Sequence, residues 1–386
     1  MKELHANWNY PSNILNGAGR LKELPDACKE LGIYSPLIVT DPVLAGLPMI
    51  LSARNTCLKA GLTCGLFSDI QANPTEQNVI DGVNAYKTGQ HDGVIAFGGG
   101  SALDAAKAVA LMVGQKNSLW DFEDIGDNWT RAIAKNIAPI IAVPTTAGTG
   151  SEVGRASVIT KVDEKVKKII FHPQMLPGTV ILDPELTLSL PANITAATGM
   201  DALSHSLEAL CSPFYHPMAE GIAVEGIRLI KEYLPRAFTN GNDVEARTHM
   251  MVASSMGATA FQKGLGAMHA IAHSLGALYG AHHGLLNAIL MPYVLKVNRA
   301  EIETKIERLA GYIGLEDSSF DGFMYWIFEM RRNLNIPHAL SELDIDDSQA
   351  QLVGVMSAND PSAAGNPVVF SPEEYTAIFL SAVNGC

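Results

Sequence analysis

The sequence has few cysteines, and they do not fall into pairs. Five occur in 386 residues, and no two of them form a CxxC motif; they are Cys28, Cys57, Cys64, Cys211 and Cys386. An odd, scattered set in a chain of this length is typical of reduced thiols in the cytosol. We therefore expect a cytoplasmic protein with neither a disulfide framework nor a zinc site built from cysteine.

Positive charge and long apolar runs are also scarce. The 27 Lys and Arg residues are outnumbered by 40 Asp and Glu residues, which leaves a formal net charge of -13. Such an acidic surface repels nucleic acid and anionic membranes. No apolar run reaches the roughly 20 residues needed to cross a bilayer, and the first ten residues lack the apolar core of a signal peptide. Neither nucleic acid nor a membrane is therefore an expected partner.

The pattern of apolar residues differs between the two halves of the chain. The length is too great for one ordinary core and predicts two domains. In residues 1–187, β-rich runs such as 36–40, 93–97 and 139–143 alternate with helical patterns, which predicts an α/β domain with a parallel sheet. In residues 188–386, apolar residues recur at spacings of three and four, which predicts an all-helical domain.

The dinucleotide fingerprint GxGxxG is absent, so a standard Rossmann domain is not supported. Another glycine-rich turn, Gly98-Gly99-Gly100-Ser101, joins a predicted strand to a predicted helix. Glycine lets the backbone approach a ligand, and the helix N-terminus suits a phosphate. A plain turn with a capping box from Ser101 to Asp104 explains the same residues, and both interpretations can hold at once.

Two further segments lie where predicted strands end. Residues 144–152 combine glycines with the hydroxyls of Thr145, Thr146, Thr149 and Ser151. They form either a ligand-binding loop, since α/β proteins bind ligands at the carboxyl ends of strands, or an irregular polar loop. Asp41 follows residues 37–40 and suits a ribose while repelling a 2'-phosphate, which favours NAD over NADP. A solvated turn aspartate explains Asp41 equally well.

Acidic and histidine side chains gather in the second half of the chain. Asp201 and His205 lie four residues apart in a helical pattern, and His269 and His273 repeat that spacing on another. A further pair, at 282 and 283, follows, so that these motifs together hold five of the 11 histidines. One carboxylate with imidazoles suits Zn or Fe(II) rather than Ca or Mg. A single histidine is usually an ordinary core or surface residue, but this constellation favours a metal site. Spacing alone does not choose four ligands among the six candidates.

The chain resembles the iron-dependent (group III) alcohol dehydrogenases, a family that includes lactaldehyde reductase and the propanediol and butanol dehydrogenases. The resemblance runs from residue 10 to residue 367 and implies a fold of the dehydroquinate synthase-like type. The motifs that carry it are residues 98–107, the Pro-Thr-Thr-Ala-Gly-Thr-Gly-Ser-Glu run at 144–152, residues 198–205 and residues 264–284.

The resemblance assigns roles to individual residues. It implies that Asp201, His205, His269 and His283 bind the metal, with Fe(II) preferred and Zn as the alternative, and that His273 is a catalytic residue beside the nicotinamide. The residues implied to bind NAD are Asp41, Gly98, Gly99, Gly100, Ser101, Asp104, Thr145, Thr146, Thr149 and Lys168. A homodimer or a higher homo-oligomer is also implied.

We therefore expect a metal-dependent oxidoreductase that interconverts a small alcohol and its aldehyde or ketone with NAD(H). Departures from the family at Gln262-Lys263, Ser274 and Val368 leave the substrate open. Three rival interpretations are a lyase of the dehydroquinate synthase superfamily, a non-redox metal hydrolase and a non-catalytic binding module.

Overall fold

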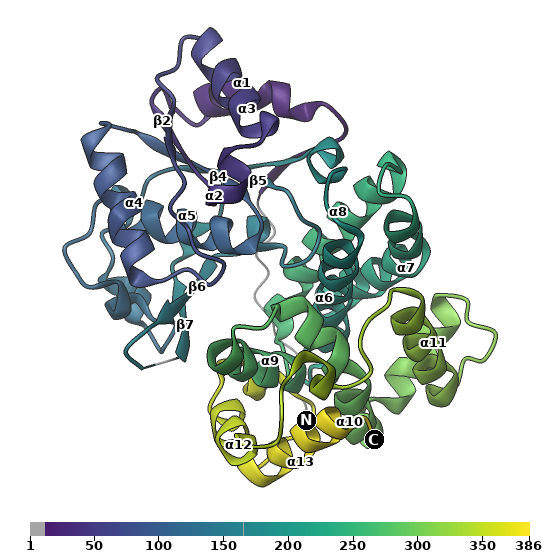
Figure 1. Cartoon of the computed structure of the whole chain (residues 1–386). Helices are drawn as coiled ribbons and strands as arrows, with labels where there is room; N and C mark the ends of the chain where they lie inside the picture. Colours follow the sequence, from purple (N-terminus) through teal and green to yellow (C-terminus); the bar gives the residue numbers. More distant parts are fainter. Residues whose placement is uncertain (1–11, 165) are drawn as a thin grey trace. The chain divides into compact units, whose positions relative to one another are not determined.

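The computed structural model describes residues 12–164 and 166–386, and these form two compact units (Figure 1). One unit contains residues 12–146 and 150–188. The other contains residues 147–149 and 189–386. Each unit has its own hydrophobic core, because the two largest groups of buried apolar side chains do not share a residue.

The first unit is built on a six-stranded sheet in which every paired strand is parallel. Its order is β1 (Asn13–Asn16), β8 (Thr179–Leu182), β5 (Ile140–Pro144), β4 (Gly93–Gly98), β2 (Pro36–Val39) and β3 (Gly65–Phe67). Every residue of β2, β4, β5 and β8 is buried. Strands buried on both faces read as continuous apolar runs rather than as alternating patterns. The predicted α/β fold with a parallel sheet is therefore confirmed.

Helices connect these strands, and an antiparallel hairpin is added to them. The helices are α1 (Leu24–Glu30), α2 (Pro42–Ala45), α3 (Pro48–Lys59), α4 (Glu76–Thr88) and α5 (Gly100–Met112). The hairpin consists of β6 (Ala156–Lys161) and β7 (Val166–Phe171), and it packs against α5. Its residues gave no strand signal in the sequence analysis, because they mix lysines with β-branched residues.

The second unit is helical, as predicted. Its long helices are α6 (Ala192–Cys211), α7 (Pro217–Thr239), α8 (Val244–Ala260), α9 (Ala267–Tyr279), α10 (His283–Tyr312), α11 (Phe320–Asn333), α12 (Ala350–Ala358) and α13 (Pro372–Asn384). Helix α6 is central, since every residue from 195 to 211 is buried and α7, α8 and α10 pack around it. Across residues 12–164 and 166–386, no helix combines the length and the apolar character that a membrane span requires.

Two lysines cap the carboxyl end of α6. The Lys263 side chain is buried, and its ammonium donates to the Leu210 carbonyl oxygen at 3.0 Å and to Glu220 at 2.7 Å. Lys305 donates to the same Leu210 oxygen at 3.0 Å. Cations are favourable beside the carbonyls that end a helix. Burial is the main cause that lowers the pKa of Lys263 to about 8, with Glu220 acting in the opposite direction.

The first turn of α10 lies against α6 at Gly284. A β-carbon on this glycine would lie 2.5 Å from the Ala197 carbonyl oxygen and 3.0 Å from the β-carbon of Asp201. Because the first of these atoms belongs to the backbone of a buried helix, it cannot easily move away. Glycine therefore sets the distance between α10 and α6.

The capped end of α6 gives a pH prediction. Between about pH 8 and the ordinary lysine pKa near 10.4, the folded protein releases the Lys263 proton while the unfolded chain keeps it. Stability should therefore rise with pH across this window, relative to a Lys263→Met variant. Thermal midpoints of both proteins from pH 7 to 10.5 measure the difference. Lys296→Met, at an exposed position of α10, is the control. A gap between wild type and Lys263→Met that stays constant would contradict the prediction.

Close helix packing gives a second prediction. Gly284→Ala should destabilise the protein by about 1–3 kcal/mol, the usual cost of overfilling a packed interior. The matched control is Gly221→Ala on α7, where an added β-carbon would meet no atom within 4 Å. Alanine should be neutral there or stabilising by about 0.5–1 kcal/mol. Chemical denaturation compares the two variants, and equal effects would show that the α6–α10 approach is not tight.

Candidate metal centre and nucleotide site

Three of the predicted ligands lie together inside the helical unit. Asp201 and His205 are one turn apart on α6, and His269 lies on α9. Each of the three side chains offers one ligand atom, and these three atoms all lie within 4.8 Å of one another. All three residues are buried. The spacing of four places Asp201 and His205 on one face of their helix, and α9 brings His269 to that face.

His283 begins α10 next to this group. Its Nε2 atom lies 3.8 Å from Asp201 Oδ1, and the centre of its ring lies 5.2 Å from that of His269. His282, the other member of the pair, is exposed and caps α10, because its Nδ1 atom accepts a hydrogen bond from the amide of Leu285. Of the two neighbours, only His283 therefore lies beside the three clustered residues.

A residue that sequence reasoning missed, Asn287, bridges these side chains. Its amide nitrogen donates to Asp201 Oδ1 at 2.9 Å and lies 3.2 Å from both His269 Nε2 and His283 Nε2. Asn287 is fully buried, and its Oδ1 atom has no hydrogen-bond partner. The signal in the sequence was its position, four residues after His283 on one helix face.

Two carboxylates also escaped the sequence analysis, and each of them holds a histidine ring. Glu208 accepts a hydrogen bond from His269 Nδ1 at 2.6 Å. Burial is the largest single cause and lowers the pKa of His269, but the charge and hydrogen bond of Glu208, together with the charges of Asp201 and Asp360, outweigh burial and raise it. Glu208 lies three residues after His205 on α6, which was a usable signal. The second carboxylate, Asp360, is far from any histidine in the sequence and gave no signal.

His273 pairs with Asp360. Its Nδ1 atom lies 3.0 Å from Asp360 Oδ2, and its ring stacks on that of His283 with 5.2 Å between centres. Burial is the largest single cause and raises the pKa of Asp360, but the adjacent His273 and the hydrogen bonds from Ser362 together outweigh it, and the pKa is lowered. His273 thus lies beside the clustered donors, and its hydrogen bond to Asp360 fixes one ring nitrogen.

This donor set fits a divalent metal. Carboxylate oxygen and imidazole nitrogen are ligands for both Fe(II) and Zn. Burial lowers the pKa of His205 to about 4, so its ring is neutral near pH 7, as a ligand must be. The unpartnered Oδ1 atom of Asn287 adds a polar group to this buried site.

In the α/β unit, the glycine turn lies at the carboxyl end of β4. Gly98 has a φ of 147°, and a β-carbon on it would lie 2.8 Å from that of Ala102. Helix α5 begins at Gly100, and its N-cap, Gly99, offers no side chain to cap the first amides. These amides remain available for an anion. The capping box from Ser101 to Asp104 considered as the alternative is wrong, because the Ser101 hydroxyl instead donates to the Ala72 carbonyl oxygen.

Asp104 lies one turn into α5, and its carboxylate is directed at the protein's own backbone and side chains. It accepts from the Ser151 hydroxyl at 2.5 Å and from the amide of Val158 at 3.0 Å. The buried Lys107 ammonium lies 3.4 Å away and donates to the Ser151 carbonyl oxygen. Because these contacts join α5 to the loop at 151 and to β6, Asp104 orders the residues around the turn.

The threonine loop follows β5 and Asp41 follows β2, the two strands that flank β4 in the sheet. The amide of Thr145, just after β5, donates to the Gly98 carbonyl oxygen at 3.0 Å, and a β-carbon on Gly99 would lie 3.6 Å from Thr146 Oγ1. Thr149 groups instead with the helical unit. Asp41 caps α2, and both of its cap bonds end on Oδ1. The turn role and the ribose role of Asp41 are therefore compatible.

The predicted cofactor lysine, Lys168, is already paired. Its ammonium lies 3.1 Å from Glu123 and 3.1 Å from Glu164. The preceding residue, Lys167, points to the other face of β7, because side chains alternate along a strand. Burial lowers the pKa of Lys167, and the charge of Asp104 opposes that shift. Because Asp104 lies on α5, the Lys167 ammonium lies on the α5 side of the hairpin. The better candidate is therefore Lys167, one residue from the predicted position.

Comparisons with known proteins agree with this geometry. The model of a family described as iron-containing alcohol dehydrogenase matches residues 11–184, and the model of the C-terminal region of the Fe-containing alcohol dehydrogenase family matches residues 195–383. The 4-hydroxybutyrate dehydrogenase of Cupriavidus necator is 37% identical over 379 residues, which cover 95% of this chain and 97% of that protein. The NAD-dependent methanol dehydrogenase of Bacillus methanolicus is 32% identical and covers 98% and 100%.

Solved structures give the same result. A crystal structure described as 1,3-propanediol oxidoreductase has a TM-score of 0.92 at 32% identity and covers 98% of this chain and 100% of its own. The sulfoacetaldehyde reductase from Bifidobacterium kashiwanohense in complex with NAD+ has a TM-score of 0.88 at 28% identity and covers 99% and 100%. With both halves of the chain matched by the two parts of one family, the protein belongs to the iron-containing alcohol dehydrogenases.

Proposed function

We propose that this metal-dependent oxidoreductase binds Fe(II) through Asp201, His205, His269 and His283 and converts a small alcohol to its aldehyde or ketone with NAD. The observation that carries the proposal is the buried group of Asp201, His205 and His269, whose ligand atoms lie within 4.8 Å of one another. His283 completes a set of one carboxylate and three imidazoles. Zn accepts the same donors, and the iron-containing family favours Fe(II).

On the cofactor side, we propose that the amides at Gly99, Gly100 and Ser101 bind the pyrophosphate of NAD. Thr145 and Thr146, beside this turn, support that role. The family resemblance adds Gly98, Thr149 and Asp41, and the charge of Asp41 disfavours the 2'-phosphate of NADP. Asp104 acts indirectly, through the loop that it holds.

When bound, a divalent metal supplies Lewis-acid polarisation of the alcohol oxygen, and NAD supplies the hydride acceptor. The protein contributes a neutral His205 and rings fixed by carboxylates. His273, held at Nδ1 by Asp360, has Nε2 as the nitrogen that can accept or return a proton. This supports a proton-relay role for His273.

Two of the family departures do not identify the substrate. Lys263 is used inside the helical unit, and the Ser274 hydroxyl donates to the Ala270 carbonyl oxygen. No observation favours a lyase or a hydrolase, since the curated relatives named above are dehydrogenases. We further propose a cytoplasmic homodimer, to be checked by cell fractionation and sedimentation. The free cysteines fit a reducing compartment.

The proposed ligands predict the effect of removing one imidazole. His269→Ala should lower metal affinity more than about 100-fold, because even changes behind a ligand cost about 10- to 100-fold. Alcohol oxidation, followed through NADH absorbance, should be lost while NADH binding, followed by fluorescence, persists. His282→Ala, which removes the exposed neighbour of His283, should keep both metal and activity. Full turnover of metal-free protein would rule out the proposed mechanism.

The two adjacent lysines give a matched pair for the cofactor side. Lys167→Met should weaken NAD binding about tenfold, because a hydrogen bond to a charged group contributes about 1.5–3 kcal/mol. Lys168→Met, which removes only the pairs with Glu123 and Glu164, should leave NAD affinity nearly unchanged. Calorimetric titration with NAD compares them. The reverse order of effects would return the role to Lys168.

A further inference from the structure

We infer that Glu208 is a positioning residue that fixes the His269 imidazole in the tautomer needed to bind the metal. The inference rests on the proposed ligand role of His269. Glu208 is buried on α6 and belongs to neither the proposed ligands nor the proposed cofactor contacts.

Three hydrogen bonds to the start of α9 use both oxygens of the Glu208 carboxylate. Oε2 accepts from His269 Nδ1 at 2.6 Å and from the amide of Gly266 at 2.8 Å, while Oε1 accepts from the amide of Met268 at 2.7 Å. An ionised carboxylate only accepts hydrogen bonds. The proton of a neutral His269 ring must therefore be on Nδ1, which leaves the Nε2 lone pair facing Asp201 and Asn287.

The helix start that carries His269 depends on this carboxylate. The N-cap residue Gly266 has no side chain to cap α9, so Glu208 on α6 supplies the acceptors instead. A β-carbon at Gly266 would lie 3.0 Å from Glu208 Oε1 and 2.9 Å from Asn366 Oδ1. Glycine thus lets two acceptors approach the same helix end, where negative charge is favourable.

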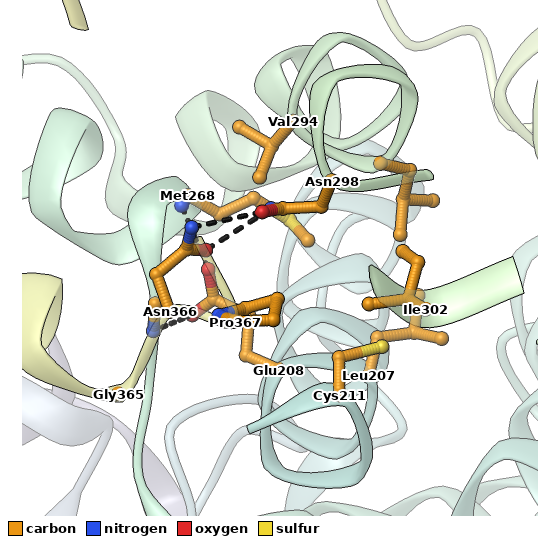
Figure 2. Close-up of a pocket in the computed structure, with 12 residues that line it drawn as sticks. Leu207, Glu208, Cys211, Met268, Val294, Asn298, Ile302, Gly365, Asn366 and Pro367 are labelled. Carbon is orange, nitrogen blue, oxygen red and sulfur yellow. Dashed lines mark hydrogen bonds between the residues drawn. The ribbon is translucent and has the colours of Figure 1, made fainter. Parts of the chain in front are cut away.

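Asn366 holds the helix start from the other side. Its Oδ1 atom accepts from the amide of Ala267 at 3.2 Å and from Asn298 at 3.0 Å, and its amide nitrogen donates to Asn298 Oδ1 at 2.9 Å. The two asparagines face each other in Figure 2. Of the two groups at this helix end, Glu208 alone bonds the His269 ring, so the orienting role belongs to the carboxylate.

A small cavity lies behind Glu208, and Figure 2 shows it between Glu208, Cys211, Met268 and Asn298. The space open to the centre of a water molecule is ≈ 10 Å³, close to what one water requires. A glutamine amide has the same heavy-atom shape as the glutamate carboxylate, so Glu208→Gln removes the charge without changing this cavity.

Glutamine offers one acceptor oxygen where glutamate offers two, and its amide nitrogen only donates. If that nitrogen faces His269, Nδ1 must accept, and the ring proton moves to Nε2, where it blocks metal binding. If the oxygen faces His269, Nδ1 still donates, but the negative charge that makes the ring a better ligand is lost. Glu208→Gln should therefore lower the affinity for Co(II), followed by visible absorbance, about 10- to 100-fold. Cys211 lines the same cavity. Cys211→Ala is the control, because it leaves the Glu208–His269 hydrogen bond in place, and its Co(II) affinity should stay within about twofold of wild type.

A direct measurement separates orientation from general support of the fold. In metal-free protein with 15N-labelled histidine, at a pH where the ring is neutral, wild-type His269 should carry its proton on Nδ1. Glu208→Gln should reduce the fraction of His269 rings that carry the proton on Nδ1, because one orientation of the amide turns a donor toward that nitrogen. A wild-type His269 protonated on Nε2 overturns the inference, even if the variant does not fold. A folded variant with wild-type Co(II) affinity also overturns it.

These outcomes are distinct from failure of the proposed function. If His269→Ala keeps its metal, the proposed ligand set is wrong. If His269→Ala loses its metal while Glu208→Gln binds Co(II) as wild type does, the ligand set stands and only the role of Glu208 is wrong.

Discussion

Two carboxylates buried on one helix, Asp201 and Glu208, set the requirements that the helical unit must meet. Burying an ionised carboxylate is costly unless it is paired and hydrogen-bonded. Asp201 accepts a hydrogen bond from the Asn287 amide and lies close to His283. Glu208 accepts hydrogen bonds from two backbone amides and from the His269 imidazole at the start of α9. Helices α6, α9 and α10 converge where these charges need partners, and the proposed metal ligands lie there.

The α/β unit meets a similar requirement with charges of both signs. The Lys107 ammonium is buried among the Ser151 carbonyl oxygen, other backbone carbonyls and the Asp104 carboxylate. Asp104 in turn binds Ser151 and Val158. A loop rich in glycine and threonine has little apolar surface to hold it, so these buried polar contacts supply its order. The glycine turn can then present its amides from a rigid base.

The sequence was informative where a periodic pattern reports on local geometry. Continuous apolar runs identified the buried parallel strands, and the spacing of four put Asp201 and His205 on one helix face. It was less informative where a contact joins distant segments. The pairing of His273 with Asp360 spans 87 residues, and nothing near Asp360 indicated it. Lys167 and Lys168 are adjacent in the sequence, yet the pleat of β7 places their side chains on opposite faces. Because the sequence did not predict this strand, it could not show which of the two lysines lies on which face.

The contacts of Asn287 bear on how the protein acquires its metal. The proposed donors are held by hydrogen bonds and helix packing that belong to the protein alone, with Asn287 bridging Asp201, His269 and His283. In a zinc finger, by contrast, the ligands assemble only as the metal binds, and the metal drives folding. Here the side chains around the proposed site already contact one another through the fold itself, so the site does not depend on metal-driven folding of the kind seen in a zinc finger.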